Sequence, residues 1–375
     1  MKIAIGMNIQ DGPFGGGNQF GKSLTQFLIN HGHQVFFDLT EQDLDIILLT
    51  DPRVYLHSVS FGPVEVINYI QQTNKNAILV HRVNECDERK GTTSVNKELE
   101  KANSIMDHTI YIASWLVDLF KNQGLQFTKN YSVIKNGADN AIFTFQQKQL
   151  KQGQKIKIIT HHWSTHPNKG WDVYAYLNEA LGHEPLCHQF EFHYVGHLPK
   201  GFHNNHIIVH PPCAGKELAN ILQKADVYLS ASINEPAGMH HIEGALCGLP
   251  LLYRESGALP EYCQNYGISF HDTSDVLTRL QLLIEKYDYF AKRMKEYDNT
   301  SDKMNSEYLQ LFERLIQSKE AIYKRRTKKL ESIWYRLHMQ LFFWSRRLFA
   351  KLFSNFYAKK TPSTVHVENV SKKTH

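Results

Sequence analysis

Short apolar runs alternate with segments of helical periodicity along most of the chain. Lys2–Asn8 is typical of a buried strand, and the apolar residues of Gly17–Asn30 recur at every third or fourth position, as in an amphipathic helix. The alternation continues to residue 137 and restarts after residue 155. Strands that alternate with helices predict parallel sheets covered by helices on both faces. We therefore expect an α/β fold.

The predicted strands fall into two sets. The first set is Lys2–Asn8, His33–Leu39, Asp45–Thr50, Asn76–Val83, His108–Ala113 and Tyr131–Ile134. The second set is Lys157–Thr160, Phe190–Val195, His206–His210, Asp226–Ser230, Pro250–Tyr253 and Ile268–His271. Each set is enough for one doubly wound sheet, and ligands commonly bind at the carboxyl edges of such sheets or between domains.

A polar stretch rich in Gln and Lys at residues 146–155 separates the two sets and predicts an interdomain linker. We therefore predict a Rossmann-like N-terminal domain at 1–150 and a Rossmann-like C-terminal domain at 151–316, facing each other across a cleft. Tyr287–Gln317 has a helical pattern and ends the second domain. Residues 362–375 have few apolar side chains, so we predict that they are disordered.

Residues 317–361, which we call the tail, concentrate positive charge. The chain has a net charge of +5, and the tail carries 12 Lys or Arg residues against two Glu. Apolar residues such as Trp334, Leu341 and Trp344 recur between the basic ones at helical spacing. Basic amphipathic helices with aromatic residues lie in anionic headgroup layers. We therefore predict an anionic membrane surface as a partner of the tail, and we expect that removing residues 320–375 leaves the fold intact.

The composition excludes several other classes of protein. Hydrophobic residues make up 42% of the chain, which suits a globular core, and no run approaches the roughly 18 apolar residues of a membrane-spanning helix. The five cysteines form no C-x-x-C pair, which favours reduced thiols. The first strand is too short for the apolar part of a signal peptide. Outside the tail the chain is mildly acidic, so we predict no nucleic-acid partner. The reduced thiols and the basic tail together predict a cytoplasmic protein that associates with the inner face of the membrane.

The most informative motif is Glu235-Pro-Ala-Gly238-Met-His-His-Ile-Glu243, with two carboxylates eight positions apart. It follows the predicted strand Asp226–Ser230, so Glu235 lies at the ligand-binding edge of the sheet. Glu243 lies about two turns into the next helix. Gly238 would leave backbone N–H groups free at the start of that helix, where an anion is favoured. Together these groups predict a site with acceptors for sugar hydroxyls and donors for phosphate.

The motif continues to Gly248-Leu-Pro250 and, further on, Gly257-Ala-Leu-Pro-Glu261. In this form it resembles the donor-site signature E-P-x-G-x-x-x-x-E-G/A-x-x-x-G-x-P of glycosyltransferase family 4. The resemblance implies the GT-B fold of two facing Rossmann-like domains, a nucleotide-sugar donor, retention at the anomeric carbon, and neither a metal nor another cofactor. It further implies that Glu235 holds sugar hydroxyls and that Glu243 binds the ribose. The donor-binding residues that it implies around the helix start are Ala237, Gly238 and Met239.

A glycine-rich segment follows the first predicted strand. Gly16 and Gly17 would let the backbone approach a ligand closely. They match the glycine-rich start of the same family pattern, and the resemblance implies that they bind the donor, close to its phosphate or to the acceptor. The residues Gly16-Gly-Asn-Gln-Phe-Gly21-Lys22-Ser23 also match the phosphate-binding loop G-x-x-x-x-G-K-S of nucleoside triphosphatases. Two features oppose this alternative: six residues separate the strand from the glycines, and the apolar phase places Gly21 and Lys22 inside a helix.

The segment Thr160–Gly170 resembles the family segment whose basic pair contacts the donor diphosphate. Lys169 fits the Lys of that pair, whereas Ser164 stands where the family has Arg. Serine can donate a hydrogen bond to phosphate but carries no charge, so Lys169 should contribute more. His161, His162 and His166 allow a zinc site as an alternative, but their spacing is not that of a helix-face pair and no carboxylate accompanies them. We therefore predict no metal site.

Two further candidates follow the fourth predicted strand of the first domain. Arg82 and Glu85 lie at the carboxyl edge of that strand, where the family often has a His or Arg facing the transferred sugar. We predict a catalytic role for Arg82, with Glu235 and Lys169, and an acceptor-side role for Glu85. The alternative is a solvated charged loop. Lys135-Asn136-Gly137 resembles a hinge motif of the family and is interpreted as structural.

The sequence therefore predicts a retaining glycosyltransferase of the hexosyltransferase class. Its expected substrates are a nucleotide-sugar and a glycan or lipid-linked acceptor, in the synthesis of surface polysaccharide or glycolipid. One alternative is a non-catalytic protein of the same fold that binds nucleotide-sugar or glycan. The other is the nucleoside triphosphatase, for which Lys22 would be essential.

Overall fold

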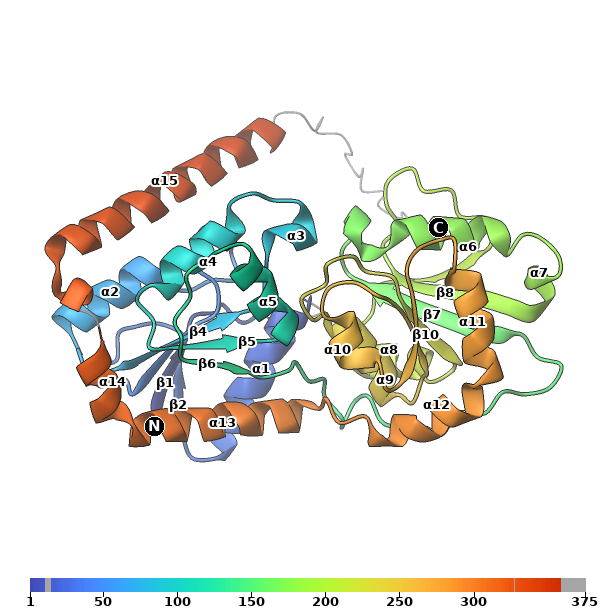
Figure 1. Cartoon of the computed structure of the whole chain (residues 1–375), viewed down its shortest axis with the longest axis horizontal. Helices are drawn as coiled ribbons and strands as arrows, with labels where there is room; N and C mark the ends of the chain where they lie inside the picture. The colour runs from blue at the N-terminus through green and yellow to red at the C-terminus, as the bar shows by residue number, and fades with distance from the viewer. Residues whose placement is uncertain (11–14, 327, 359–375) are drawn as a thin grey trace, which may run out of the picture.

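The computed structural model describes residues 1–10, 15–326 and 328–358, which form two domains side by side (Figure 1). The predicted disordered segment 362–375 lies outside the described residues. Each domain contains one six-stranded sheet, and every strand pair in both sheets is parallel. The predicted α/β fold of two doubly wound domains is therefore confirmed.

The N-terminal sheet has the order β2-β1-β3-β4-β5-β6. Its strands are β1 (Lys2–Ile5), β2 (Gln34–Phe36), β3 (Ile46–Leu49), β4 (Ile78–Val83), β5 (His108–Tyr111) and β6 (Tyr131–Val133). The helices that cover it are α1 (Gly15–Asn30), α2 (Pro63–Gln72), α3 (Asp87–Lys90), α4 (Val95–Asn103) and α5 (Ser114–Asn122). The first strand is shorter than predicted, because the chain turns away from the sheet after Ile5.

The C-terminal sheet has the order β12-β11-β10-β7-β8-β9. Its strands are β7 (Ile156–His162), β8 (Phe190–Gly196), β9 (Ile207–His210), β10 (Val227–Ser230), β11 (Leu251–Arg254) and β12 (Gly267–Phe270). Its helical segments are η1 (Pro167–Lys169), α6 (Trp171–Ala180), α7 (Leu186–Gln189), α8 (Gly215–Leu222), α9 (Met239–Leu246), α10 (Leu259–Cys263), α11 (Val276–Glu285), α12 (Tyr287–Arg293) and η2 (Met294–Glu296). The five cysteines are free thiols.

The chain then returns to the N-terminal domain through α13 (Ser301–Gln317) (Figure 1). Tyr308 and Phe312 on this helix are buried in the same cluster as Phe20 of α1. The segment predicted as one helix from 287 to 317 is interrupted, because Thr300 is extended and its hydroxyl accepts a hydrogen bond from the N–H of Lys303 as the cap of α13. Gly137 packs against Thr300 so closely that an added Cβ would lie 2.0 Å from the Thr300 carbonyl oxygen.

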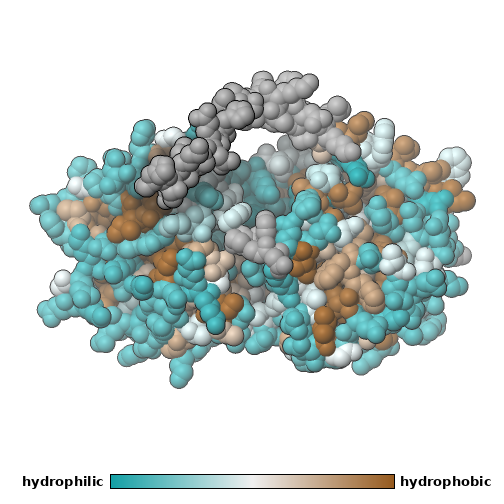
Figure 2. Space-filling model, turned by 180° about the vertical axis from the view of Figure 1, so that it is seen from behind, coloured by the Kyte–Doolittle hydropathy of each residue, from teal (hydrophilic) through white to brown (hydrophobic). Residues whose placement is uncertain are grey.

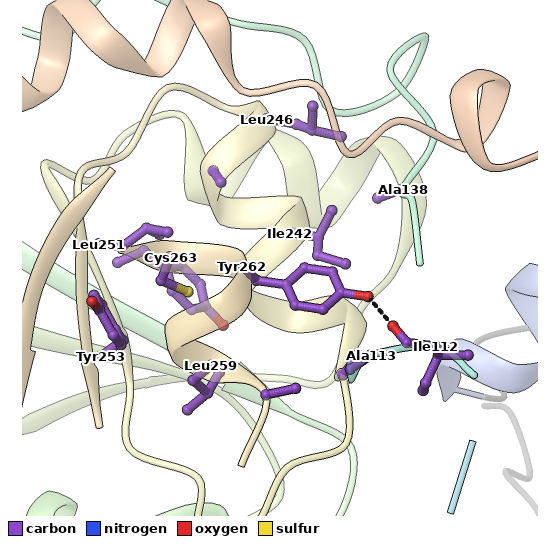
Figure 3. Close-up of a cluster of buried hydrophobic side chains, with 14 of the residues drawn as sticks. Ile112, Ala113, Ala138, Ile242, Leu246, Leu251, Tyr253, Leu259, Tyr262 and Cys263 are labelled. Atoms are coloured by element: carbon purple, nitrogen blue, oxygen red, sulfur yellow. Dashed lines mark hydrogen bonds between the residues drawn. The ribbon is translucent and has the colours of Figure 1, made fainter. Parts of the chain in front are cut away.

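A buried cluster joins the two domains around Tyr262 of α10 (Figure 3). The Tyr262 hydroxyl donates to the carbonyl oxygen of Ile112 at 2.7 Å and accepts from the N–H of Asn136 at 2.8 Å. Nearby, the hydroxyl and N–H of Ser114 both donate to Glu261 at 2.8 Å. Ser114 therefore does not cap the following helix, although serine is a common N-cap: Ala113 is the N-cap, and the Ser114 hydroxyl bonds across the domain interface.

The tail forms α14 (Lys319–Arg325), η3 (Lys328–Glu331) and α15 (Ile333–Ala358). One face of α15 packs on the N-terminal domain, where Met339 and Phe343 are buried in the cluster that includes Val66 of α2. Ile322 of α14 is buried as well. Removing residues 320–375 would therefore uncover core side chains, which contradicts the expectation that this deletion leaves the fold intact.

The opposite face of α15 exposes large apolar side chains. Trp334, Leu341 and Trp344 are 82%, 66% and 62% exposed, and Ile333, Leu337 and Leu348 are exposed beside them. Hydrophobic residues gather along this edge of the N-terminal domain in Figure 2. Among the helices that the structure describes, none combines the length and the apolar character needed to cross a bilayer.

Candidate active site

A cavity of about 280 Å³ lies between the two domains. Its N-terminal wall includes Gly16 and Gly17 at the start of α1, and its C-terminal wall includes Lys169, Glu235 and Glu243. β7, β10 and β4 all end at this cavity, so it lies at the carboxyl edges of both sheets. That is the edge at which open α/β sheets bind ligands.

Lys169 and Glu235 form a buried ion pair at the base of the cavity. Lys169 ends η1, and Glu235 follows β10, so the pair joins the loops after two neighbouring strands. Gly170 makes this approach possible: its φ is +97°, and an added Cβ would lie 2.4 Å from the Cβ of Ala231. Gly257 is equally close to the backbone of Glu235 on the other side.

Arg89 of the N-terminal domain completes the charge cluster. Its Nε lies 3.6 Å from one oxygen of Glu235, and a terminal guanidinium nitrogen lies 3.0 Å from Glu85. Burial alone would raise the pKa of the Glu235 carboxyl, but Lys169 and Arg89 beside it lower the pKa to about 2. Burial lowers the pKa of Lys169, and Glu235 offsets part of that effect. Glu235 is therefore a carboxylate at neutral pH and a weak base.

Glu243 lies on α9 and faces β7. One of its carboxylate oxygens is 2.7 Å from Nε2 of His161, and Nδ1 of the same ring is 3.1 Å from the hydroxyl of Tyr228. Because both ring nitrogens have partners, the imidazole orientation is fixed, and it holds Glu243 at the cavity wall.

The N-terminus of α9 opens into the cavity. Gly238 is its N-cap in an extended conformation, and no side chain caps the helix. Met239 approaches the glycine-rich start of α1, since a Cβ added to Gly16 would lie 2.5 Å from Cγ of Met239. Ala237 also lines the cavity. Uncapped N–H groups beside Lys169 make this end of the helix suitable for an anion.

The neighbouring histidines are buried and neutral. Nε2 of His162 lies 2.7 Å from the Tyr174 hydroxyl, and Nε2 of His240 lies 2.8 Å from the Ser230 hydroxyl. Burial lowers the pKa of both rings well below the ordinary histidine value. His166 was the third histidine of the alternative zinc site. Its ring Nδ1 accepts a hydrogen bond from the N–H of Asn168. Within the described parts of the chain, no group of three or more His, Cys, Asp or Glu side chains is arranged to hold a metal ion.

Arg82 is almost fully buried and lines the cavity from β4. Its guanidinium lies 3.9 Å from the ring centre of Phe20 and donates to Asn136 at 2.9 Å. The Asn136 amide donates in turn to the Ala237 carbonyl oxygen at 2.8 Å. Arg82 is thereby connected to the start of the Glu235 motif. Glu85, in contrast, is not among the residues that line the cavity; it pairs with Arg89 and with Lys90, 3.4 Å away.

The glycine-rich segment does not form the phosphate-binding loop of a nucleoside triphosphatase. α1 begins at Gly15, so the residues from Gly16 to Lys22 are helical rather than wrapped around an anion. Gly21 is buried within the helix, where an added Cβ would lie 3.1 Å from Sδ of Met7. This geometry opposes the triphosphatase alternative, because that loop must precede its helix.

Three residues that the sequence did not single out contribute to this site: Arg89, Asn136 and His161. Asn136 was interpreted as part of a structural hinge, and His161 was considered only as a metal ligand. Arg89 lies in the segment for which a solvated charged loop was the alternative interpretation. The signal in the sequence that could have indicated Arg89 was the number of charged residues after β4. That number did not indicate which of their side chains turns toward the other domain.

Comparisons with known proteins agree with this geometry. Residues 200–300, which contain the Glu235 motif, match the family Glycosyl transferases group 1. No curated protein matches the chain. The fold is similar to that of sucrose-phosphate synthase from Thermosynechococcus elongatus, with 14% identity, a TM-score of 0.64, and coverage of 84% of this chain and 99% of that one.

Two ligand-bound structures are similar to the same extent. Alr3699/HepE of Anabaena, in complex with UDP-glucose, has 13% identity and a TM-score of 0.61, with 85% of this chain and 100% of that chain covered. The catalytic domain of starch synthase IV from Arabidopsis thaliana, bound to ADP and acarbose, has 12% identity and a TM-score of 0.61, with 84% and 99% covered. The family match confirms the predicted resemblance at the level of group 1 glycosyl transferases, and together with the shared fold it supports glycosyltransferase activity.

Proposed function

We propose that this chain, a glycosyltransferase of the two-domain fold described above, is a retaining enzyme. It moves a sugar from a nucleotide-sugar to a glycan or lipid-linked acceptor in the synthesis of surface polysaccharide or glycolipid. The observation that carries the proposal is the interdomain cavity. It brings the uncapped start of α9, Lys169, Glu235 and Glu243 opposite the glycines of α1.

The C-terminal wall suits the donor. Glu243 would accept hydrogen bonds from the ribose, while the diphosphate would meet Lys169 and the N–H groups of Gly238 and Met239. As the bond between the anomeric carbon and the diphosphate breaks, negative charge builds on the departing oxygen. Fixed positive groups at that position stabilise the transition state more than the ground state. An acceptor hydroxyl then bonds to the same carbon, and its proton leaves with the diphosphate.

Glu235 would hold the donor sugar rather than transfer a proton. Its carboxyl has a pKa of about 2, so its affinity for a proton at neutral pH is low. Its pairing with Lys169 and Arg89 also fixes its orientation in the cavity. A charged acceptor in a defined position is suited to binding sugar hydroxyls. Arg82, fixed by Phe20 and Asn136, would face the transferred sugar from the N-terminal wall.

The N-terminal wall suits the acceptor, and α15 suits a membrane. Among the described residues, no atom lies within 4 Å of a Cβ added to Gly17, which supports close approach of a ligand to its backbone. The exposed apolar face of α15 carries Trp334, Leu341 and Trp344, with Arg347 exposed on the same helix. Such a face inserts into the boundary between headgroups and acyl chains of an anionic leaflet. This surface supports a lipid-linked acceptor presented at the inner face of the membrane.

A panel of UDP-, ADP- and GDP-sugars tests the proposal. Thermal shift would identify the donor that binds, and release of the nucleoside diphosphate would then be measured with that donor and with lipid-linked glycan acceptors. The expected result is stabilisation by one donor class and release that Lys169→Ala reduces. Stabilisation without release would favour the non-catalytic binding protein, and no stabilisation by any donor would overturn the donor site.

A further inference from the structure

The short helix α3 lies on the side of the N-terminal domain that faces the C-terminal domain (Figure 1), and its residue Arg89 lines the cavity. The side-chain amide of Asn168 donates to the carbonyl oxygen of Arg89 at 2.9 Å, and that of Asn234 donates to the carbonyl oxygen of Glu88 at 3.4 Å. Asn168 directly precedes Lys169, and Asn234 directly precedes Glu235. The same two loops that carry the charge pair therefore also hold α3 in place.

Arg89 gives the cavity its excess of positive charge. Among the residues that the structure describes, the charged side chains that line it are those of Arg82, Arg89 and Lys169 against Glu235 and Glu243. A diphosphate carries negative charge on both phosphate groups, so a neutral cavity would bind it weakly. Without Arg89 the fixed charges of the lining would balance. Among the histidines that line the cavity, burial keeps His162 and His240 neutral, and His161 is paired with Glu243.

The other two cations are more deeply buried than Arg89 and each has a partner in its own surroundings. Lys169 is buried against Glu235, and Arg82 is buried between Phe20 and Asn136. The Arg89 side chain is 29% exposed, and its guanidinium reaches both Glu85 and Glu235 from the cavity side. A guanidinium has five donors, so it can keep one carboxylate contact while donating two further hydrogen bonds to phosphate oxygens.

We propose that Arg89 binds the sugar-side phosphate of the donor diphosphate from the opposite domain. This inference rests on the proposed function. Because Arg89 lies beside Glu235, which would hold the sugar, its partner is the phosphate bonded to the sugar rather than the one bonded to the nucleoside. Ser164 lines the same cavity without a charge, so Arg89 supplies to this cavity, from α3, a cation that Ser164 does not supply. The diphosphate site is then complete only while α3 is held by Asn168 and Asn234.

Calorimetric binding of UDP, ADP and GDP, compared with UMP, AMP and GMP, tests the inference on the full chain. We expect Arg89→Gln to weaken binding of the preferred diphosphate about tenfold to a hundredfold, because hydrogen bonds between charged groups contribute that much. Binding of the matching monophosphate, which lacks the second phosphate, should change less than about threefold. The matched control is Lys90→Gln. Lys90 also pairs with Glu85 from α3 but does not line the cavity, so both affinities should stay unchanged.

A second variant separates charge from structure. Arg89→Gln combined with Ser164→Arg returns a cation to the cavity from the other wall, and it should recover diphosphate affinity while monophosphate affinity stays constant. If Arg89→Gln leaves diphosphate binding unchanged, or weakens both nucleotides equally without recovery in the double variant, the inference is overturned while the proposed function stands. If the unsubstituted protein binds none of the three diphosphates, the proposed function fails and this inference fails with it.

Discussion

Nε2 of His161 lies 2.7 Å from a carboxylate oxygen of Glu243, so the proposed ribose-binding residue is held by a neighbouring strand. The other ring nitrogen is 3.1 Å from the Tyr228 hydroxyl. Because β7 and β10 are adjacent in the sheet, the positions of His161 and Tyr228 follow from strand pairing. The orientation of the carboxylate is therefore set by the core of the C-terminal domain before any nucleotide binds.

Glu243→Ala should weaken binding of the preferred nucleoside diphosphate about tenfold to a hundredfold, because a hydrogen bond to a carboxylate contributes about 1.5–3 kcal/mol. Calorimetry with UDP, ADP and GDP measures the change. The control is Glu217→Ala on the adjacent helix α8, an exposed position, where affinity should be unaffected. Equal affinities in both variants would remove Glu243 from the nucleotide site.

Glu235→Gln should act on turnover rather than on nucleotide affinity. Glutamine keeps the size of the side chain but loses the charge that holds the sugar in the transition state, so kcat should fall about a hundredfold or more. Binding of the nucleoside diphosphate, which has no sugar, should not weaken, because the substitution leaves Lys169 and Arg89 in place and removes a negative charge beside them. Steady-state kinetics and calorimetry on the same preparation separate the two effects, and full activity would refute this role of Glu235.

The acid stability of the protein should depend on the same residue. The pKa of Glu235 is about 2 in the folded protein, below its ordinary value of 4.5. A lowered folded-state pKa adds stability that is present above pH 4.5 and is lost as the pH falls towards 2, and the amount is on the order of a few kcal/mol. The stability difference between the unsubstituted protein and Glu235→Gln should therefore shrink over that range. Denaturant midpoints at several pH values measure it, and parallel curves would contradict the assignment.

Gly170→Ala should destabilise the protein more than Gly32→Ala. Both glycines have positive φ, +97° and +79°, so alanine costs each about 1–2 kcal/mol. At Gly170 the added Cβ would also meet Ala231 at 2.4 Å, whereas at Gly32 nothing lies within 4 Å. The larger loss of Tm should be accompanied by reduced activity, since the clash displaces the adjacent Lys169. Equal losses of Tm would show that backbone strain alone operates at both sites.

Replacing Trp334 and Trp344 with Ser should weaken binding to vesicles that contain phosphatidylglycerol by about tenfold or more, because burying one large apolar side chain contributes about 1.5–3 kcal/mol. Sedimentation with vesicles measures binding, and thermal melting verifies that the fold persists. Tyr289→Ser, at an exposed aromatic position on α12 of the other domain, is the matched control. Undiminished binding of the double variant would exclude α15 as the membrane contact. Point substitutions serve better than deletion here, because Met339 and Phe343 belong to the core.

The alternation of apolar runs and helical segments was sufficient to predict the two parallel sheets, because hydrophobic periodicity is a local property of the chain. The spacing from Glu235 to Glu243 and the glycine between them likewise predicted a strand edge followed by a helix start. Local pattern was less informative at Ser114. A serine at the start of a helical segment is a common cap, but the Ser114 hydroxyl donates to Glu261 of the other domain.

The sequence by itself determined the α/β fold and the position of Glu235 after a strand and of Glu243 in the next helix, since strand, turn and helix signals lie within a few residues of them. Lys169 was predicted from the resemblance to the family segment. Only the tertiary structure decided that Arg89 faces Glu235, that His161 holds Glu243, and that Asn136 joins Arg82 to Ala237. The first and third of these contacts join residues of different domains, and the second joins β7 to helix α9 within the C-terminal domain. Their formation depends on how domains and elements distant in the sequence pack together, which no short stretch of sequence encodes.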